Sequence, residues 1–215
     1  MRRVAAMMSL VVATTAGAQS FQGVVTYQMG KQNETMIYTG SGGSKVRIDM
    51  NDPHMPAGGA SIIWDTGANS MMMVMNAQKM YMTMDMGKMM ANTGADTARG
   101  KLTKVGSEVV AGVPCDDYKG TSNSGTPETT VCIAHGMGNF LWFGGNNPMM
   151  ARMNSRVSGL SSAVAGGGFP LKIMKADGTV DMIATKVDKH SVDPSLFAPP
   201  AGFTQMQMPA GMQQH

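Results

Sequence analysis

The sequence predicts a mainly β protein with one helix laid on its sheet. Apolar and polar residues alternate in many short segments, and Asn, Gly and Asp gather between these segments. A single segment instead has apolar residues three and four positions apart, which is the spacing of an amphipathic helix. The chain of 215 residues has the length expected for an export signal followed by one domain of moderate size.

Residues 1–18 are typical of a secretory signal peptide. Arg2 and Arg3 form a basic start, an apolar run follows, and small residues precede the expected cleavage near Ala18. This run is too short for a permanent membrane anchor, and no later run reaches the length of a transmembrane helix. We therefore expect a periplasmic or secreted protein without a transmembrane segment in the mature chain. Its single domain would span residues 19–203, and a flexible Met-rich tail would span residues 204–215.

Nine segments are expected to be antiparallel strands, because their side chains alternate in character as on a half-buried sheet. They are residues 21–29, 44–50, 60–65, 70–75, 80–86, 113–120, 127–134, 169–176 and 179–187. Turn-forming sequences separate several of them, and Asp177-Gly178 is a strong hairpin signal. The segment 80–86 carries a methionine at every second position, so these methionines are expected on one face of the sheet.

Cys115 and Cys132 are the only two cysteines, and in an exported protein such a pair predicts a disulfide. A metal held by two thiolates would need further ligands nearby, and the surrounding sequence offers none at a suitable spacing. If the two flanking strands pair with Cys115 opposite Cys132, two more pairs share their face: Asp117–Thr130 and Lys119–Glu128.

One helix is expected from Pro148 to about Ala165. Asn147 is a suitable N-cap, and proline is favoured at the first helical position. The glycines at 166–168 would end the helix. Its apolar stripe should lie on the sheet, either as plain core or as the lid of a cavity; the stripe consists of Met150, Met153, Val157, Leu160 and Val164.

The sequence contains 26 methionines, an unusually large share of the chain. They could replace Leu and Ile in an ordinary core, or they could line a cavity for an apolar ligand of variable shape. A third interpretation is Cu(I) binding, because thioethers are soft ligands. The best candidate for copper is the tail, with Met206, Met208, Met212 and His215.

Asp65-Thr66-Gly67 follows two apolar residues and a tryptophan, as in the active-site signature of aspartic proteases. That chemistry needs two such aspartates, and the chain has one Asp-Thr-Gly. The same residues are favoured in tight turns. A turn is therefore the preferred interpretation, and a protease using Asp65 in a dimer is the alternative.

The order of these segments resembles an exported bacterial family catalogued as domain of unknown function 4412. The resemblance is carried by FQGVVTYQM, SKVRIDM, IIWD, KMYMTM, VVAGVPCDDYKG, TTVCIAHGMG, FPLKI and DPSLFAPPAGF. That family is similar in outline to the LolA-like lipoprotein-carrier proteins of the envelope. The resemblance implies an α+β fold in which one or two helices pack on the concave face of a strongly curved antiparallel sheet, or incomplete β-barrel. It implies a carrier role and brings no catalytic residues.

These observations predict an exported envelope protein that binds or carries an apolar, lipid-like ligand. Its partners would be this ligand and, as a second class, an envelope protein. The formal net charge of +3 comes without a concentrated basic stripe, so nucleic acid is not an expected partner. No catalytic residue, cofactor or metal ligand is assigned. The candidate lining residues are Met73, Met75, Met80, Met82, Met84, Met150, Met153, Val157 and Leu160.

Overall fold

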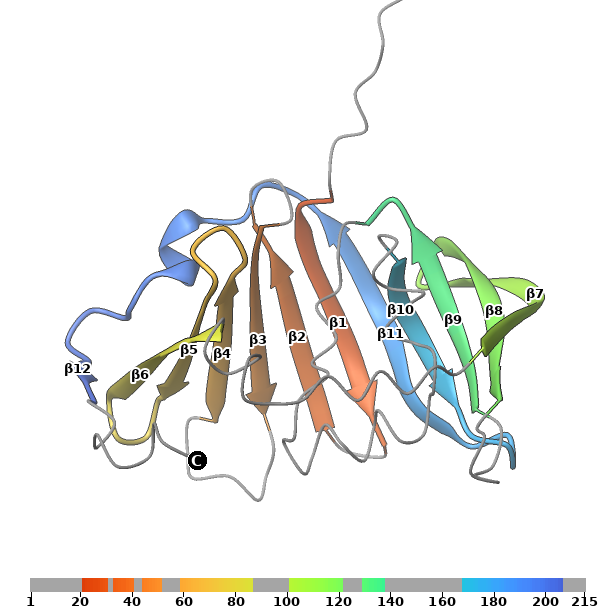
Figure 1. The fold of residues 1–215 in the computed structure, drawn as a ribbon, viewed down its shortest axis with the longest axis horizontal. Helices are drawn as coiled ribbons and strands as arrows, with labels where there is room; N and C mark the ends of the chain where they lie inside the picture. Colours follow the sequence, from red (N-terminus) through yellow and green to blue (C-terminus); the bar gives the residue numbers. More distant parts are fainter. Residues whose placement is uncertain are drawn as a thin grey trace, which may run out of the picture.

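The computed structural model describes residues 21–30, 33–40, 44–51, 59–86, 101–121, 129–137 and 168–206. They form one sheet of 12 strands, in the order β12-β6-β5-β4-β3-β2-β1-β11-β10-β9-β8-β7 (Figure 1). The strands are β1 (Gly23–Met29), β2 (Asn33–Thr39), β3 (Lys45–Asn51), β4 (Ala60–Asp65), β5 (Ser70–Met75), β6 (Met80–Asp85), β7 (Lys101–Val110), β8 (Val113–Thr121), β9 (Thr129–His135), β10 (Gly168–Met174), β11 (Val180–Lys189) and β12 (Thr204–Gln205).

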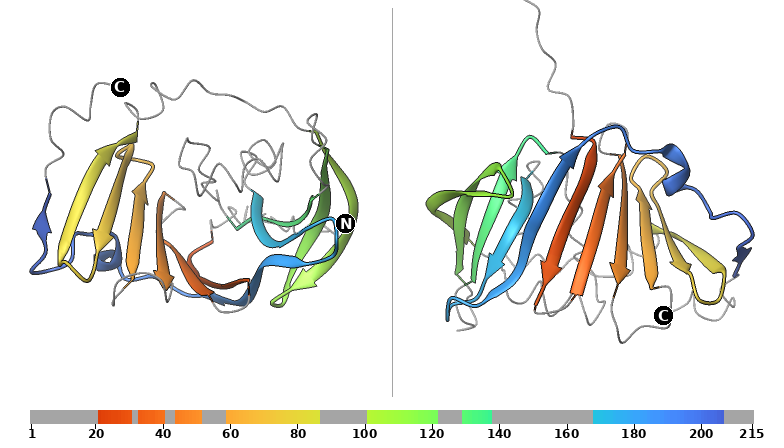
Figure 2. Two further views of the ribbon diagram at one scale, coloured as in Figure 1. Left: turned by 90° about the horizontal axis from the view of Figure 1, so that it is seen from below. Right: turned by 180° about the vertical axis from the view of Figure 1, so that it is seen from behind.

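The predicted mainly β class and the curved antiparallel sheet are confirmed. Neighbouring strands pair antiparallel, apart from the short parallel pair of β12 with β6. Seen from below, the strands follow a trough-like path (Figure 2, left). A 3₁₀ turn, η2 (Pro194–Phe197), follows β11. The helix expected from Pro148 to about Ala165 lies outside the described residues, so the sheet alone is established here.

The residues of β1 to β6 alternate between two faces, and the register aligns the buried ones across the strands. One row crosses all six strands and contains Val25, Ile37, Ile48, Ile62, Met73 and Met82. We call the face with this row the inner face. Val25 and Ile37 are fully buried in the main core, and Ile48 and Ile62 are partly buried against it. Alternation in the sequence thus places one apolar side chain of each strand in a continuous layer.

A C-terminal strap, residues 190–206, covers the opposite, outer face of the sheet. Phe197 from η2 packs with Ile63, Met72 and Val74 in a second, smaller core. Gly40 allows this close approach, because a Cβ there would lie only 2.7 Å from the Phe197 ring. The blue strap runs beneath the strands in Figure 2 (left), so the inner face lines the trough.

Arg47 on β3 ties the strap to the sheet. Its guanidinium donates to the carbonyl oxygen of Leu196 at 2.9 Å, to Ser61 Oγ at 3.0 Å and to Asp49 Oδ1 at 2.7 Å. Beyond η2, residues that the sequence analysis assigned to the tail join the sheet as β12. There the N–H of Thr204 donates to the carbonyl of Lys79 on the neighbouring hairpin.

The predicted disulfide is confirmed, but the predicted register of its hairpin is wrong. Cys115 and Cys132 are bonded, with their Cα atoms 5.4 Å apart. Cys132 lies directly opposite Asp117, two positions from the partner we expected. Lys119 consequently lies opposite Thr130, and Glu128, its expected partner, is outside the described residues. A disulfide can therefore form between diagonal neighbours on one face, because these also lie close together.

Candidate functional site

The hairpin of β5 and β6 presents six methionines on the inner face. The register places them in three directly opposed pairs: Met71–Met84, Met73–Met82 and Met75–Met80. We call these six residues the methionine array. A four-residue turn joins the two strands, and Lys79 in this turn adopts a φ of 51°. The array arises from the strict alternation of the two strands and from a turn that aligns them without offset.

The array continues onto β4 and β3 as an apolar surface. Ile62 lies opposite Met73 and Trp64 lies opposite Met71. Met71 is 8% exposed and Trp64 is 3% exposed, whereas Met73, Met75, Met80, Met82 and Met84 are half-buried. The array thus passes from the core at one end to positions that a ligand could contact.

The outer face of the same two strands is different. Met72 and Val74 are buried under the strap with Phe197, and Thr83 and Asp85 on β6 are exposed. The strap therefore covers the face opposite to the array. All five candidate lining residues of β5 and β6 lie on the inner face. The other four, Met150, Met153, Val157 and Leu160, lie outside the described residues.

Three buried side chains of the inner face, those of Tyr27, Thr35 and Thr39, carry a hydroxyl group. A buried hydroxyl group needs a hydrogen-bond partner. The Tyr27 hydroxyl donates to the carbonyl of Pro170 at 2.8 Å, and burial raises the pKa of Tyr27 well above its ordinary value. Thr35 Oγ1 donates to the sulfur of Met29 at 3.4 Å. Thr39 is 2% exposed, and its Oγ1 has no hydrogen-bond partner within the described part of the chain. The other inner-face side chains described on β1 to β6 are mainly apolar.

Asp65 is the last residue of β4, directly before the turn that leads to β5. Its Oδ1 accepts a hydrogen bond from the backbone N–H of Ala68 at 2.9 Å, and its Oδ2 lies 3.1 Å from Lys45 Nζ. The hydrogen bond from Ala68 is the main cause that lowers the pKa of Asp65, and Lys45 adds to it. A carboxylate engaged in this way closes a turn, whereas the protease mechanism needs a carboxyl that shares a proton with a second one. The turn interpretation explains every contact that Asp65 makes here.

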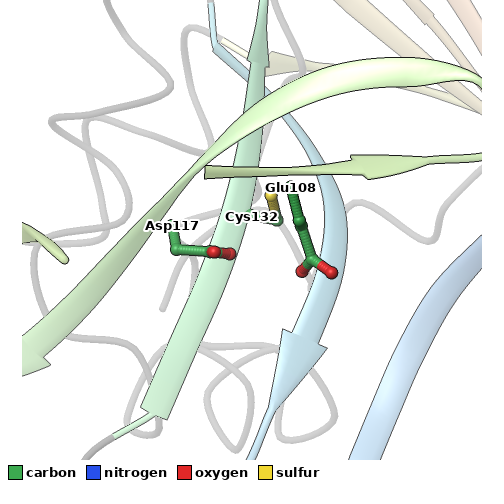
Figure 3. A group of neighbouring side chains, drawn as sticks. All are labelled: Glu108, Asp117 and Cys132. Carbon is green, nitrogen blue, oxygen red and sulfur yellow. The ribbon is translucent and has the colours of Figure 1, made fainter. Parts of the chain in front are cut away.

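A cluster of charged groups lies beside the disulfide at the other end of the sheet. Figure 3 shows Glu108 of β7 and Asp117 of β8 around Cys132 of β9. Lys172 of β10 donates to both carboxylate oxygens of Glu108, at 2.9 and 3.0 Å. Burial raises the pKa of Asp117, and the charge of Glu108 and a hydrogen bond to it raise this pKa further. Glu108 and Asp117 are thus close enough that a negative charge on one disfavours ionisation of the other.

This cluster does not suit a metal ion. One oxygen of Glu108, one of Asp117 and the sulfur of Cys132 lie within 4.8 Å of one another. However, Cys132 is bonded to Cys115, so its sulfur is not a thiolate. The Lys172 ammonium already occupies the oxygens of Glu108. The cluster is therefore a charged support beside the disulfide, and sequence reasoning missed it because Glu108 and Lys172 are 64 positions apart.

The fold and the methionine array define a class of protein: a single curved β-sheet with a methionine-rich apolar inner face. The chain belongs to the family described as Domain of unknown function (DUF4412), whose model matches residues 21–203. No curated protein matches the sequence. Among the described residues, no helix has the length and apolar character needed to cross a membrane.

Comparison with solved structures gives similarities at low scores. A structure of MucB in complex with MucA(peri) is 15% identical with a TM-score of 0.44, over 88% of this chain and 57% of that chain. A structure of MucB is 13% identical with a TM-score of 0.44, over 86% of this chain and 58% of that chain. The Pseudomonas aeruginosa MucA/MucB complex is 14% identical with a TM-score of 0.42, over 85% and 56%. The chain spans less than two thirds of these proteins, and such scores carry no argument about its function.

Proposed function

We propose that this protein is an exported, non-catalytic binding or carrier protein of the cell envelope that holds an apolar, lipid-like ligand on its inner face. The observation that carries the proposal is the methionine array, which continues as apolar surface over Ile62 and Ile48. Its half-buried thioether side chains are flexible and can adapt to ligands of variable shape. An ordinary core would have buried these positions as fully as Val25 and Ile37.

Apolar contact alone would be sufficient for useful affinity. Each methylene moved from water onto such a face contributes about 0.8 kcal/mol, so an acyl chain needs few polar contacts. The helix predicted from Pro148 to about Ala165 would partly close the site with Met150, Met153, Val157 and Leu160. Export would follow cleavage of the signal peptide near Ala18. It would leave one domain, from residue 19 through β12, with a Met-rich tail after it, in the periplasm or outside the cell. The resemblance to LolA-like carriers supports this role, and an envelope protein would be a second partner.

The proposal is tested by binding of a fluorescent fatty acid to the exported protein. The wild type should take up the probe saturably, and Met80→Asp with Met82→Asp should abolish uptake while the disulfide and the circular dichroism spectrum remain unchanged. Thr83→Asp is the matched control, because Thr83 lies on the same strand but is exposed on the outer face. This variant should bind as the wild type does.

Two results would reject the proposal. One is a wild-type protein that shows no saturable uptake of any such probe. The other is equal loss of uptake in the Thr83→Asp control, because the inner face would then have no special part in binding. Native mass spectrometry of protein extracted without detergent would complement the titration by showing whether a lipid copurifies.

A further inference from the structure

We propose that the methionine array is also a thioether site for a soft monovalent metal ion, Cu(I) or Ag(I). This inference does not depend on the apolar-ligand proposal, since it concerns the sulfur atoms and not the apolarity of the side chains. It also differs from the copper interpretation made from the sequence, which assigned the ion to the tail.

The first argument is the residue type. All six inner-face positions of β5 and β6 are methionine. The inner face of β1 to β4 instead mixes residue types, with Met29 and Met50 among Val25, Ile37, Trp64 and others. The outer face of β5 and β6 also varies, with Ser70, Val74 and other residues. An apolar layer needs no sulfur, so the concentration of six methionines in three opposed pairs at this hairpin points to the chemistry of the thioether.

The second argument is proximity. Side chains directly opposite on antiparallel strands have Cβ atoms about 5 Å apart, and neighbours along one face of a strand are about 7 Å apart. Methionine has a long, flexible side chain, so sulfurs from adjacent pairs can turn toward one point. Met73 and Met82 form the central pair, with a pair on either side. Three or four thioethers can therefore reach one ion at the centre of the array.

The third argument is selectivity. Thioethers are soft, uncharged ligands that suit Cu(I), whereas Mg²⁺, Ca²⁺ and Zn²⁺ favour oxygen, nitrogen or thiolate ligands. The neighbouring inner-face positions on β4 are Ala60, Ile62 and Trp64, which offer no carboxylate. A thioether has no proton to lose on binding a metal, so the affinity of this site should not change between mildly acidic and neutral pH.

The test is a titration of the full exported protein with Ag(I), and with Cu(I) under anaerobic conditions against a chromophoric Cu(I) chelator. Trp64 lies directly opposite Met71, so in a Trp142→Phe background its fluorescence should report the ion. Met73→Leu with Met82→Leu keeps the apolar volume but removes the central sulfurs, and should weaken binding by about tenfold or more. Met72→Leu, on the outer face of β5, should bind as the wild type does.

The outcomes separate this inference from the apolar-ligand proposal. The Met73→Leu, Met82→Leu variant should still take up the fluorescent fatty acid, because leucine is as apolar as methionine. If this pair of changes affects folding, seen by circular dichroism, Met82→Leu alone serves as the milder variant. Unchanged metal affinity in the leucine variants would overturn the inference. It would also be overturned by loss of binding on acidification, or by loss in a variant of the tail, Met206→Leu with Met208→Leu and Met212→Leu.

Discussion

Cys132 is bonded to Cys115 although it lies directly opposite Asp117, two positions further along β8. The disulfide thus crosses its hairpin diagonally, and the sulfur of Cys132 lies beside the carboxylates of Asp117 and Glu108. This arrangement connects the covalent link to the charged cluster of β7, β8 and β10. Removal of the disulfide and removal of the Asp117 charge should therefore each change the free energy of unfolding.

Removing the disulfide should destabilise the protein by about 3 kcal/mol, because the bond closes a loop between residues 17 positions apart. The measurement is urea unfolding of Cys115→Ala with Cys132→Ala against the oxidised wild type. Intact protein should also be two mass units lighter than its reduced form, because two hydrogens are lost when the bond forms. Free thiols on both residues of the exported protein would contradict the assignment.

Asp117→Asn should raise the free energy of unfolding at pH 7 and have no effect near pH 3. The pKa of Asp117 is raised in the folded state, mainly by burial and then by Glu108. The folded protein therefore binds more protons than the unfolded chain between pH 3.8 and this raised pKa, and stability falls as pH rises through that window. The gain should be below about 1 kcal/mol, because solvent screens the partly exposed pair.

Asp116→Asn is the control for this prediction. It should lower the free energy of unfolding at pH 7, whereas Asp117→Asn should raise it. A hydrogen bond from Lys104 lowers the pKa of Asp116. Its contribution to stability is therefore present at neutral pH and is lost as pH falls below 3.8. Denaturant unfolding of both variants between pH 3 and 7 checks the pair. If both variants changed the free energy of unfolding in the same direction, the pKa values of Asp116 and Asp117 would not be shifted in opposite directions.

Arg47→Met should loosen the C-terminal strap. The change removes donors to Leu196, Ser61 and Asp49 and should cost about 2 kcal/mol, because the hydrogen bonds come from a charged group that is mostly buried. Hydrogen exchange should accelerate at the Thr204 and Met206 amides, which bond to the β5–β6 hairpin region. Lys45→Met is the control, since Lys45 is more exposed and pairs with Asp65. Equal exchange rates in all three proteins would show that Arg47 does not hold the strap.

Asp65→Ala should lower the free energy of unfolding. It should not change the cleavage of unfolded substrates, because we expect the wild type to cleave none. Loss of the hydrogen bond to Ala68 should cost about 1 kcal/mol at pH 7. Because the pKa of Asp65 is lowered, this difference should shrink as pH falls below 3.8. Incubation of the wild type with unfolded substrates from pH 3 to 7 should give no cleavage. Pepstatin-sensitive cleavage that Asp65→Asn abolishes would instead make Asp65 catalytic.

Much of the strand content could be predicted from the sequence, because strand alternation is a local property. Each predicted segment from residue 21 to residue 86 contains a strand of the structure, and the two cysteines form the predicted bond. Three strands, β2, β7 and the short β12, were not predicted. Strand β7 is polar along most of its length and lies at the end of the sheet, so it lacks the alternation of a half-buried strand.

The sequence by itself determined that Met73, Met75, Met80, Met82 and Met84 could share a face, since side chains two positions apart on a strand point the same way. Only the tertiary structure decided which face that is. Phe197 of the strap, more than a hundred positions away, covers Met72 and Val74 and leaves the methionine array on the inner face. The diagonal disulfide and the Glu108–Lys172 pair were likewise decided by strand register. Register depends on bulges and on packing between distant segments, and alternation contains no information about either.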